Sequence, residues 1–287
     1  MTDKLIVSLL PGATEMVAAI GGVSQLVGVS HACDWPPAIE SLPRVTLTPI
    51  DASRSSLEIH GAVQAAAGAG QSVIGIDADV LRTLRPDVII TQMLCDVCAV
   101  ADGEAIALAR AMTPAPEIVT LSGTTIDGVW HDIRKVGSAI GRSTEAMALT
   151  SCLEAEVAAI AARSRKARSR VVAIEWLEPL FLAGHWVPEM VTAAGGRDVG
   201  GVAGSHSVIR SWDEVIGLDP DLVLLVLCGF SEERARMEME RQSDARARDW
   251  LASRRVAILD GNAYTSRPGP RIIEGIRQIE AALAGAN

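Results

Sequence analysis

Strand-like and helix-like segments alternate along this chain, and the alternation limits the possible folds more than any other feature. Short aliphatic and β-branched runs are separated by segments with helical periodicity. In the first 124 residues the strand-like runs are at 4–10, 25–30, 87–92 and 117–122. After residue 168 they return at 170–176, 222–230 and 254–262. Each half therefore predicts an α/β lobe with a parallel sheet and helices on its faces.

The segment between the two halves has a different pattern. From Thr125 to about Lys166 the sequence keeps helical periodicity without a strand-like run, with a soft break at Gly141. A helix of ~30 residues is ~45 Å long, which is the length of a lobe and not of a loop. We therefore expect an α/β protein with a ligand cleft between two lobes that are joined by a single long α-helix. Its expected parts are an N-terminal lobe at 1–124, a linking helix at 125–168 and a C-terminal lobe at 169–287.

The two halves also resemble one another. Residues 84–88 read LRPDV and residues 218–222 read LDPDL, and each of these stretches leads into a strand-like run that ends at a cysteine. A glycine pair ends the first helical segment of each half, at 21–22 and at 195–196. Pro-Asp before a buried strand is common turn chemistry, but two landmarks in the same order favour a duplicated unit.

The composition excludes several classes of protein. A net charge of −9 argues against nucleic acid as a partner, because neutralising phosphates requires an excess of Lys and Arg. No stretch approaches the ~18 to 20 apolar residues of a membrane span, so membrane insertion is not expected. The first 16 residues show no secretory signal, which predicts a cytoplasmic protein, or a periplasmic one if the sequence has been trimmed. Five cysteines, an odd number, then favour reduced thiols over a disulfide framework.

Chemically distinctive side chains gather where the strand-like runs end. Ligands of open parallel sheets bind outside the carboxyl ends of the strands, so these positions form the candidate site. In chain order the residues found there are His31, Cys33, Asp34, Trp35, Cys95, Asp96, Cys98, Glu175, Trp176, His185, Trp186, Cys228, Asn262, Tyr264, Ser266 and Arg267. Taken alone, each His or Cys is more often a packing residue than a ligand. Packing choices would scatter over the chain, so the clustering favours a binding site over a scaffold with a vestigial cleft.

The stretch CDVC at 95–98 raises three possibilities. Thiol–disulfide exchange is disfavoured because Asp96, between the two thiols, opposes formation of a thiolate. A zinc or iron–sulfur site needs about four ligands, which Cys95 and Cys98 supply only if Cys33 and Cys228 join them, with His31 or His185 as substitutes. The remaining possibility is that these cysteines line a pocket for a chelate.

Several long stretches resemble a known family. Residues 4–37, residues 84–91 with LRPDVIIT, residues 175–196 and residues 260–271 are similar to the substrate-binding proteins of cobalamin and iron-chelate ABC importers. Their fold consists of two Rossmann-like lobes joined by one long helix, and the similarity is greatest to the branch labelled cobalamin-binding proteins. The resemblance implies that a corrinoid or related tetrapyrrole lies between the lobes, and that residues 34–37, DWPP, present an aromatic side chain to it. It also implies an ABC permease as partner, for which Asp79 and Asp213 are the best matching docking carboxylates.

These considerations predict a binding protein for cobalamin or a related tetrapyrrole or metal chelate, and not an enzyme. A corrin or porphyrin is a broad apolar disc with polar edges, which suits the rings of Trp35, Trp176 and Trp186. The other predicted ligand-binding residues are Asp34, His31, Glu175, His185, Tyr264 and Arg267, with His185 a possible ligand to cobalt or iron. The alternative is a metal or iron–sulfur protein, either an enzyme or a non-enzymatic protein, with Cys33, Cys95, Cys98 and Cys228 as metal ligands. The sequence contains no G-x-S-x-G, H-E-x-x-H, P-loop or G-x-G-x-x-G motif after a strand, and no catalytic residue is predicted.

Overall fold

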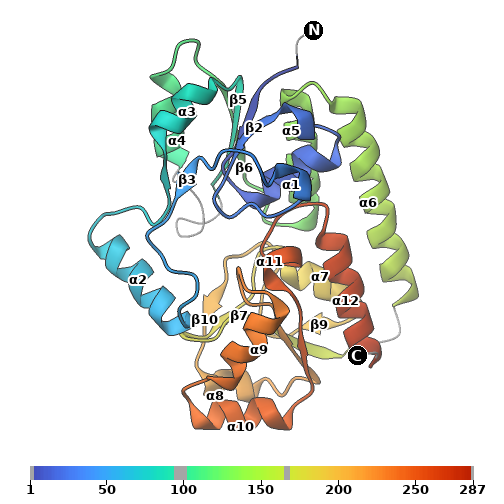
Figure 1. Cartoon of the computed structure of the whole chain (residues 1–287). Helices are drawn as coiled ribbons and strands as arrows, with labels where there is room; N and C mark the ends of the chain where they lie inside the picture. Colours follow the sequence, from blue (N-terminus) through green and yellow to red (C-terminus); the bar gives the residue numbers. More distant parts are fainter. Residues whose placement is uncertain (1–2, 94–101, 165–168, 286–287) are drawn as a thin grey trace. The chain divides into compact units, whose positions relative to one another are not determined.

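The computed structural model describes residues 3–93, 102–164 and 169–285, and it forms two compact units (Figure 1). The first unit comprises Met1–Ser53, Gly61–Gly123 and Asp127–Cys152. The second comprises Arg54–His60, Thr124–Ile126 and Leu153–Asn287. CDVC, with Cys95 and Cys98, lies outside the described residues.

The first unit is built on a parallel sheet with the strand order β2-β1-β5-β6. Its strands are β1 (Ile6–Ser8), β2 (Leu26–Val29), β5 (Val88–Gln92) and β6 (Glu117–Leu121), and a short antiparallel pair is formed by β3 (Thr46–Leu47) and β4 (Gly75–Ile76). Its helical segments are α1 (Pro11–Ala19), η1 (Val23–Gln25), η2 (Pro37–Ile39), α3 (Ala78–Leu84), α4 (Asp102–Arg110), and most of α2 (Ser56–Gly68) and of the helix that starts at Ile126. The central strands are buried and aliphatic because helices cover a parallel sheet on both faces.

The second unit repeats this plan with additions. Its core strands are β7 (Arg170–Trp176), β9 (Arg197–Asp198), β11 (Leu222–Leu225) and β12 (Val256–Ile258), all parallel, with the order β9-β7-β11-β12. The antiparallel strands β8 (Phe181–Leu182) and β10 (Val208–Ile209) extend the sheet beside the end of β7. Its helices are α7 (Val187–Ala193), α8 (Trp212–Gly217), α9 (Glu232–Glu240), α10 (Ala245–Ser253), α11 (Gly261–Tyr264) and α12 (Ile272–Ala284). The predicted parallel sheet is therefore mixed in this unit.

The two units share one strand order, which supports the predicted duplication. Among the parallel strands, β1 lies between β2 and β5 in the first unit, and β7 lies between β9 and β11 in the second. The strand order therefore reverses between β1 and β5 and between β7 and β11. Arg85 and Asp219 occupy equivalent positions before β5 and β11, and both have a left-handed backbone, with φ of 44° and 42°. A ligand site is expected outside the carboxyl ends of the strands at such a reversal.

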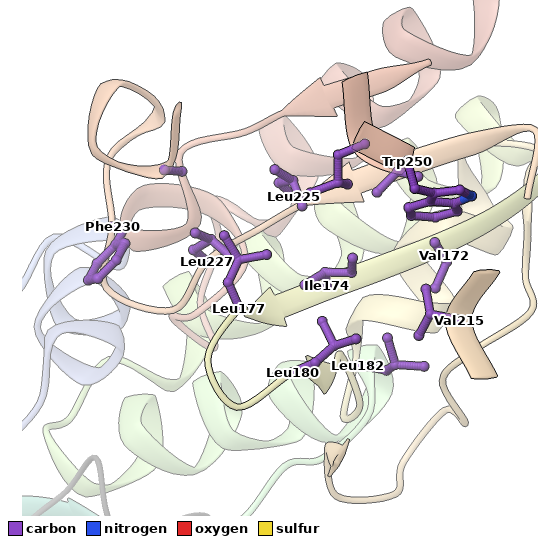
Figure 2. Close-up of a cluster of buried hydrophobic side chains, with 13 residues drawn as sticks. Val172, Ile174, Leu177, Leu180, Leu182, Val215, Leu225, Leu227, Phe230 and Trp250 are labelled. Carbon is purple, nitrogen blue, oxygen red and sulfur yellow. The ribbon is translucent and has the colours of Figure 1, made fainter. Parts of the chain in front are cut away.

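A hydrophobic cluster supports the strand ends of the second unit (Figure 2). Ile174 of β7 and Leu225 of β11 are fully buried side chains of neighbouring strands, and Val215 of α8 and Trp250 of α10 belong to the same cluster. Leu227 and Phe230 extend it past the end of β11, as Figure 2 shows. The residues that follow β7 and β11 are therefore attached to a densely packed hydrophobic cluster.

The region predicted as one long helix consists of two helices. α5 (Ile126–Ala139) ends before Gly141, whose φ of 78° favours glycine, and α6 (Ser143–Arg163) begins after it. A Cβ on Gly137 would lie 2.3 Å from that of Ala146, so the two helices pack closely at the turn. α6, of 21 residues, carries the chain from Cys152 in the first unit to Leu153 in the second. The two-lobe α/β fold with a long connecting helix is confirmed, but the helix is shorter than predicted. No helix within the described residues has the length and apolarity to cross a bilayer.

Candidate ligand-binding site

In the first unit, the loop after β2 displays Trp35. This indole is 46% exposed. All six tryptophans lie within the described residues, and the other five are buried or half-buried. The guanidinium of Arg44 holds the loop by donating to the carbonyl oxygens of Cys33 at 2.9 Å and Ser30 at 3.4 Å. Asp34, also exposed, precedes Trp35. An anchored loop with an exposed aromatic ring at a strand end can stack on a flat ligand.

His31, at the start of the same loop, is held in one orientation. Thr46 Oγ1 accepts a hydrogen bond from the backbone N–H of His31 at 2.9 Å and lies 2.6 Å from Nδ1 of the ring. The Thr46 hydroxyl donates its hydrogen to Ser30 Oγ at 3.0 Å, so Nδ1 is the donor in its contact and Nε2 carries the lone pair. Burial, and secondarily the charge of Arg44, lower the pKa of His31. His31 is therefore a neutral imidazole, the form that coordinates metals.

The cysteines within the described residues have different environments. Cys33 is 3% exposed, and its Sγ lies 3.2 Å from Thr14 Oγ1, whose hydrogen is donated to Ser8 Oγ at 2.8 Å. Cys228 is half-buried after β11, where its N–H donates to the carbonyl oxygen of Glu175 at 2.9 Å. Cys152, on α6, is exposed. Within the described ranges, no group of three or more His, Cys, Asp or Glu side chains has a metal-binding arrangement. A metal site with Cys95 and Cys98 stays a prediction.

In the second unit, both predicted tryptophans are held by hydrogen bonds from their indole N–H groups. Trp176 is half-buried at the end of β7, where its Nε1 donates to the carbonyl oxygen of Glu178 at 3.0 Å and its ring lies 5.3 Å from that of Phe230. Trp186 is 6% exposed, and its Nε1 donates to the carbonyl oxygen of Thr265 at 2.8 Å. The structure thus links Trp186 to the loop that carries Tyr264 and Arg267.

His185 is the most unusual residue of this unit. Its φ of 52° is left-handed, a costly conformation for a residue with a Cβ that is often found at functional sites. The backbone is fixed there because the N–H of His185 donates to the carbonyl oxygen of Ser205 at 2.7 Å and its carbonyl oxygen accepts from Gly204 at 2.9 Å. The ring lies 5.3 Å from the ring of His206 at 90°. Its Nε2 is buried and has no hydrogen-bond partner in the part of the chain that the structure describes.

A buried polar atom without a partner is costly, and it marks a place for a water, an ion or a ligand atom. Burial, and secondarily His206, lower the pKa of His185, so this imidazole is neutral as well. His206 itself was not predicted from the sequence, since it lies in a loop with no strand-like run before it. The ring of His206 lies beside that of His185 because residue 184 closely approaches residues 205–207. No sequence pattern predicts this approach.

The loop after β12 brings cationic and aromatic groups to the same end of the sheet. Arg267 is 5% exposed, and its Nη2 donates to Asn262 Oδ1 at 2.8 Å. The N–H of Asn262 donates to the carbonyl oxygen of Phe230 at 3.1 Å, which ties this loop to the end of β11. Tyr264 is half-buried with the guanidinium carbon of Arg271 5.0 Å from its ring centre. Glu175, Cys228 and this loop are therefore joined through backbone contacts.

The two predicted docking carboxylates are equivalent in the repeat. Asp79 and Asp213 are the second residues of α3 and α8, which lead into β5 and β11. Their side chains are 95% and 71% exposed, and each forms an ion pair with an arginine, Asp79 with Arg82 at 3.0 Å and Asp213 with Arg246.

A pair of α/β units with aromatic and polar groups at their strand ends defines a ligand-binding protein of the two-lobe class. Residues 6–242 match the model of the periplasmic binding protein family, and the chain belongs to this family, whose members are substrate-binding components of ABC transporters and not enzymes. The predicted absence of enzymatic function agrees with this membership. No curated protein matches the sequence at a significant level.

Solved structures share the fold along the whole chain. A periplasmic heme-binding protein, RhuT of Roseiflexus sp. RS-1 in apo form, has 22% identity and a TM-score of 0.70, with 99% of each chain covered. A periplasmic heme-binding protein of Pseudomonas aeruginosa has 20% identity and a TM-score of 0.75, covering 99% of this chain and 94% of its own. The periplasmic vitamin B12-binding protein BtuF of Vibrio cholerae has 19% identity and a TM-score of 0.68, with 99% and 98% covered.

The predicted cytoplasmic location is wrong. The family is one of periplasmic binding proteins, and the three relatives named above are periplasmic. The prediction depended on the first 16 residues alone.

Proposed function

We propose that this protein binds cobalamin or a related metal tetrapyrrole such as heme, and presents it to an ABC permease. One observation carries the proposal: within the described residues the buried Nε2 of His185 has no hydrogen-bond partner, and the backbone of this residue is fixed in a left-handed conformation. A neutral imidazole with an available lone pair is the side chain that coordinates cobalt or iron in such ligands. The heme-binding and vitamin B12-binding relatives support the same ligand class.

Strand-end groups of each unit, taken separately, have chemistry that suits a tetrapyrrole. Its flat face suits the exposed ring of Trp35, and its polar edges suit Arg267 and Asn262. His31 supplies a second neutral imidazole.

A spectroscopic titration tests this proposal. Purified protein is titrated with hemin, cyanocobalamin and cobinamide, and with metal-free protoporphyrin IX as the control for the metal. We expect saturable binding of at least one metal complex, a shifted absorption band, and a loss of that shift in His185→Ala. The proposal fails if calorimetry detects no binding of any of the three at high micromolar concentration.

We further propose that Asp79 and Asp213 dock on the permease. Their equivalent positions in the two units and their exposure support this role, because a partner can contact both carboxylates at once. In proteoliposomes with the cognate transporter, Asp79→Asn with Asp213→Asn should reduce stimulation of ATP hydrolysis without changing ligand affinity. Unchanged stimulation would exclude these two carboxylates.

A further inference from the structure

The loop at residues 199–207 runs closely along the backbone that leads to His185, and both belong to the second unit. A Cβ on Gly201 would lie 2.1 Å from the carbonyl oxygen of Ala183, and one on Gly200 would lie 2.7 Å from a neighbouring leucine side chain. Only glycine permits so close an approach, because it has no Cβ. These two glycines therefore set the path of the loop.

The far end of the loop fixes the unusual backbone of His185. The carbonyl oxygen of Ser205 accepts from the N–H of His185, and the N–H of Gly204 donates to its carbonyl oxygen, so both contacts hold the left-handed conformation. The next residue, His206, places its ring 5.3 Å from the ring of His185. A shift of this end of the loop would therefore change both the backbone and the surroundings of the candidate ligand residue.

The near end of the loop is fixed by Asp198, the last residue of β9. Its Oδ1 accepts hydrogen bonds from the N–H groups of Gly200 and Gly201, both at 2.8 Å. The backbone between them is paired with β7, since the N–H of Val199 donates to the carbonyl oxygen of Val171 at 2.8 Å. The carboxylate thus joins the first turn of the loop to a strand of the sheet.

The environment of this carboxylate is unfavourable for a charge. Asp198 Oδ2 is buried, and in the parts of the chain that the structure describes it has no hydrogen-bond partner. Burial raises the pKa of the carboxyl group, an effect that the N–H groups of Gly201 and Gly200 oppose. A buried carboxylate with one unpartnered oxygen lowers the stability of a fold, so its presence favours a role in arranging the loop.

We propose that Asp198 is a positioning residue for the ligand site. By holding Gly200 and Gly201 it fixes the start of the 199–207 loop, and the loop in turn fixes the backbone and the surroundings of His185. The role in ligand binding rests on the proposed function, since Asp198 acts on the ligand only through His185. The positioning of His185 can be measured without any ligand.

Nuclear magnetic resonance of the ligand-free protein tests the positioning. In Asp198→Ala, the amides of 200–205 should exchange with solvent at least ~5-fold faster, because two hydrogen bonds are lost at the start of the loop. The ring of His185 should titrate closer to the ordinary pKa of 6.5, because a displaced loop exposes a ring whose pKa is lowered by burial. Asp198→Asn keeps an acceptor oxygen and should restore both properties toward those of the wild type.

Asp244→Ala is the matched control. Asp244 Oδ1 likewise accepts from the second and third N–H groups after it, those of Arg246 at 2.9 Å and Ala247 at 3.2 Å, at the start of α10. This variant should leave the titration of His185 unchanged. An equal change of His185 in both alanine variants would overturn the proposal, because the ring would then respond to any loss of a loop contact.

Unchanged exchange of 200–205 and unchanged titration of His185 in Asp198→Ala would also overturn the proposal. If this variant does not fold, Asp198→Ser takes its place, since it keeps one oxygen on a shorter side chain. The same changes are then expected at smaller size, and their absence counts equally against the proposal.

A hemin titration measures the consequence for the ligand. Asp198→Ala should weaken hemin binding at least ~5-fold and change the absorption spectrum of the complex toward that of His185→Ala, because the imidazole is less well oriented. Asp198→Asn should restore the spectrum, and Asp244→Ala should retain it. Equal affinity and an identical spectrum in Asp198→Ala would exclude a role in ligand binding. If the wild type binds no tetrapyrrole, the proposed function fails, whereas the titration of His185 still decides whether Asp198 positions it.

Discussion

Asp87 Oδ2 accepts a hydrogen bond of 2.8 Å from the backbone N–H of Leu5, which directly precedes β1. Asp221 Oδ2 accepts the same bond at 2.7 Å from the N–H of Arg170, the first residue of β7. In both units the contact is reciprocal, because the N–H of the aspartate donates to the carbonyl oxygen of the same partner at 2.8 Å. The Asp of each Pro-Asp turn therefore aligns the central strand of its sheet with the third.

Replacing these aspartates should lower stability without affecting the ligand residues. Asp87→Ala and Asp221→Ala should each reduce the free energy of unfolding by about 1 kcal/mol, since a hydrogen bond to an exposed carboxylate is lost at the N-terminal end of a central strand. Urea denaturation measures the effect. Asp249→Ala, at an exposed position on α10, is the control, and an equal loss in that variant would contradict a specific role for the turn.

The left-handed residue two positions before each of these aspartates predicts a stabilising change. Arg85 has a φ of 44° at the C-cap of α3, where glycine is favoured because it has no Cβ to clash. Arg85→Gly should raise the free energy of unfolding by about 0.5 kcal/mol, the strain relieved being partly offset by the greater freedom of glycine in the unfolded chain. Arg85→Ala should bring no gain. A less stable glycine variant would show that the arginine side chain stabilises the turn.

These turns illustrate what the sequence could reveal. The L-x-P-D pattern before two strand-like runs predicted both strands and a repeat, because Pro and Asp act through local geometry. Gly141 likewise suggested a break, although not that it would divide the segment into two helices. The alternation of segments was sufficient to predict the two-lobe fold, because the buried strands of a parallel sheet appear in the sequence as continuous runs of aliphatic residues.

The roles of individual site residues were less predictable because they depend on contacts distant in sequence. The indole N–H of Trp186 bonds to the carbonyl oxygen of Thr265, 79 residues away, a contact that no sequence pattern predicts. The contact between Ser56 and Glu238 joins residues 182 positions apart, and neither belongs to a motif. His206 acquires significance only beside His185. Periodicity reports which face of an element is buried, but not which loops meet.

Gly184 should be intolerant of any side chain. A Cβ at this position would lie 2.4 Å from the carbonyl oxygen of Ser205 and 2.7 Å from His206 C. Gly184→Ala should therefore displace the 205–207 loop, cost about 2 kcal/mol of stability and weaken ligand binding through His185. Thermal unfolding and a heme titration measure the two effects. Gly217→Ala, which has open space around it, should leave both unchanged or improve stability, and a similar loss there would indicate a general sensitivity to alanine.

The two neutral histidines predict a pH dependence. Burial lowers the pKa of His31 and His185 below the ordinary value of 6.5 in the folded protein. Below pH ~6.5 the unfolded chain therefore binds protons that the folded protein does not, so stability should fall as the pH drops from that value toward the lowered pKa values. The double variant His31→Gln with His185→Gln should show a flatter stability profile across this window. Urea denaturation at several pH values provides the measurement, and an unchanged slope would mean that neither histidine is neutral in the fold.

Trp35 provides the most direct optical test of the ligand site. Its ring is 46% exposed, whereas the other five tryptophans are buried or half-buried, so a ligand at the strand ends should affect its emission most. Trp35→Ala should leave the free energy of unfolding within about 0.5 kcal/mol of the wild type, because an exposed ring contributes little to the core. The same variant should weaken tetrapyrrole binding by about tenfold, since stacking on an aromatic ring contributes roughly 1 kcal/mol or more. Trp35→Phe keeps a flat ring and should retain most of the affinity while losing the fluorescence change. If Trp35→Ala binds hemin and cobalamin as the wild type does, the loop after β2 does not contact the ligand.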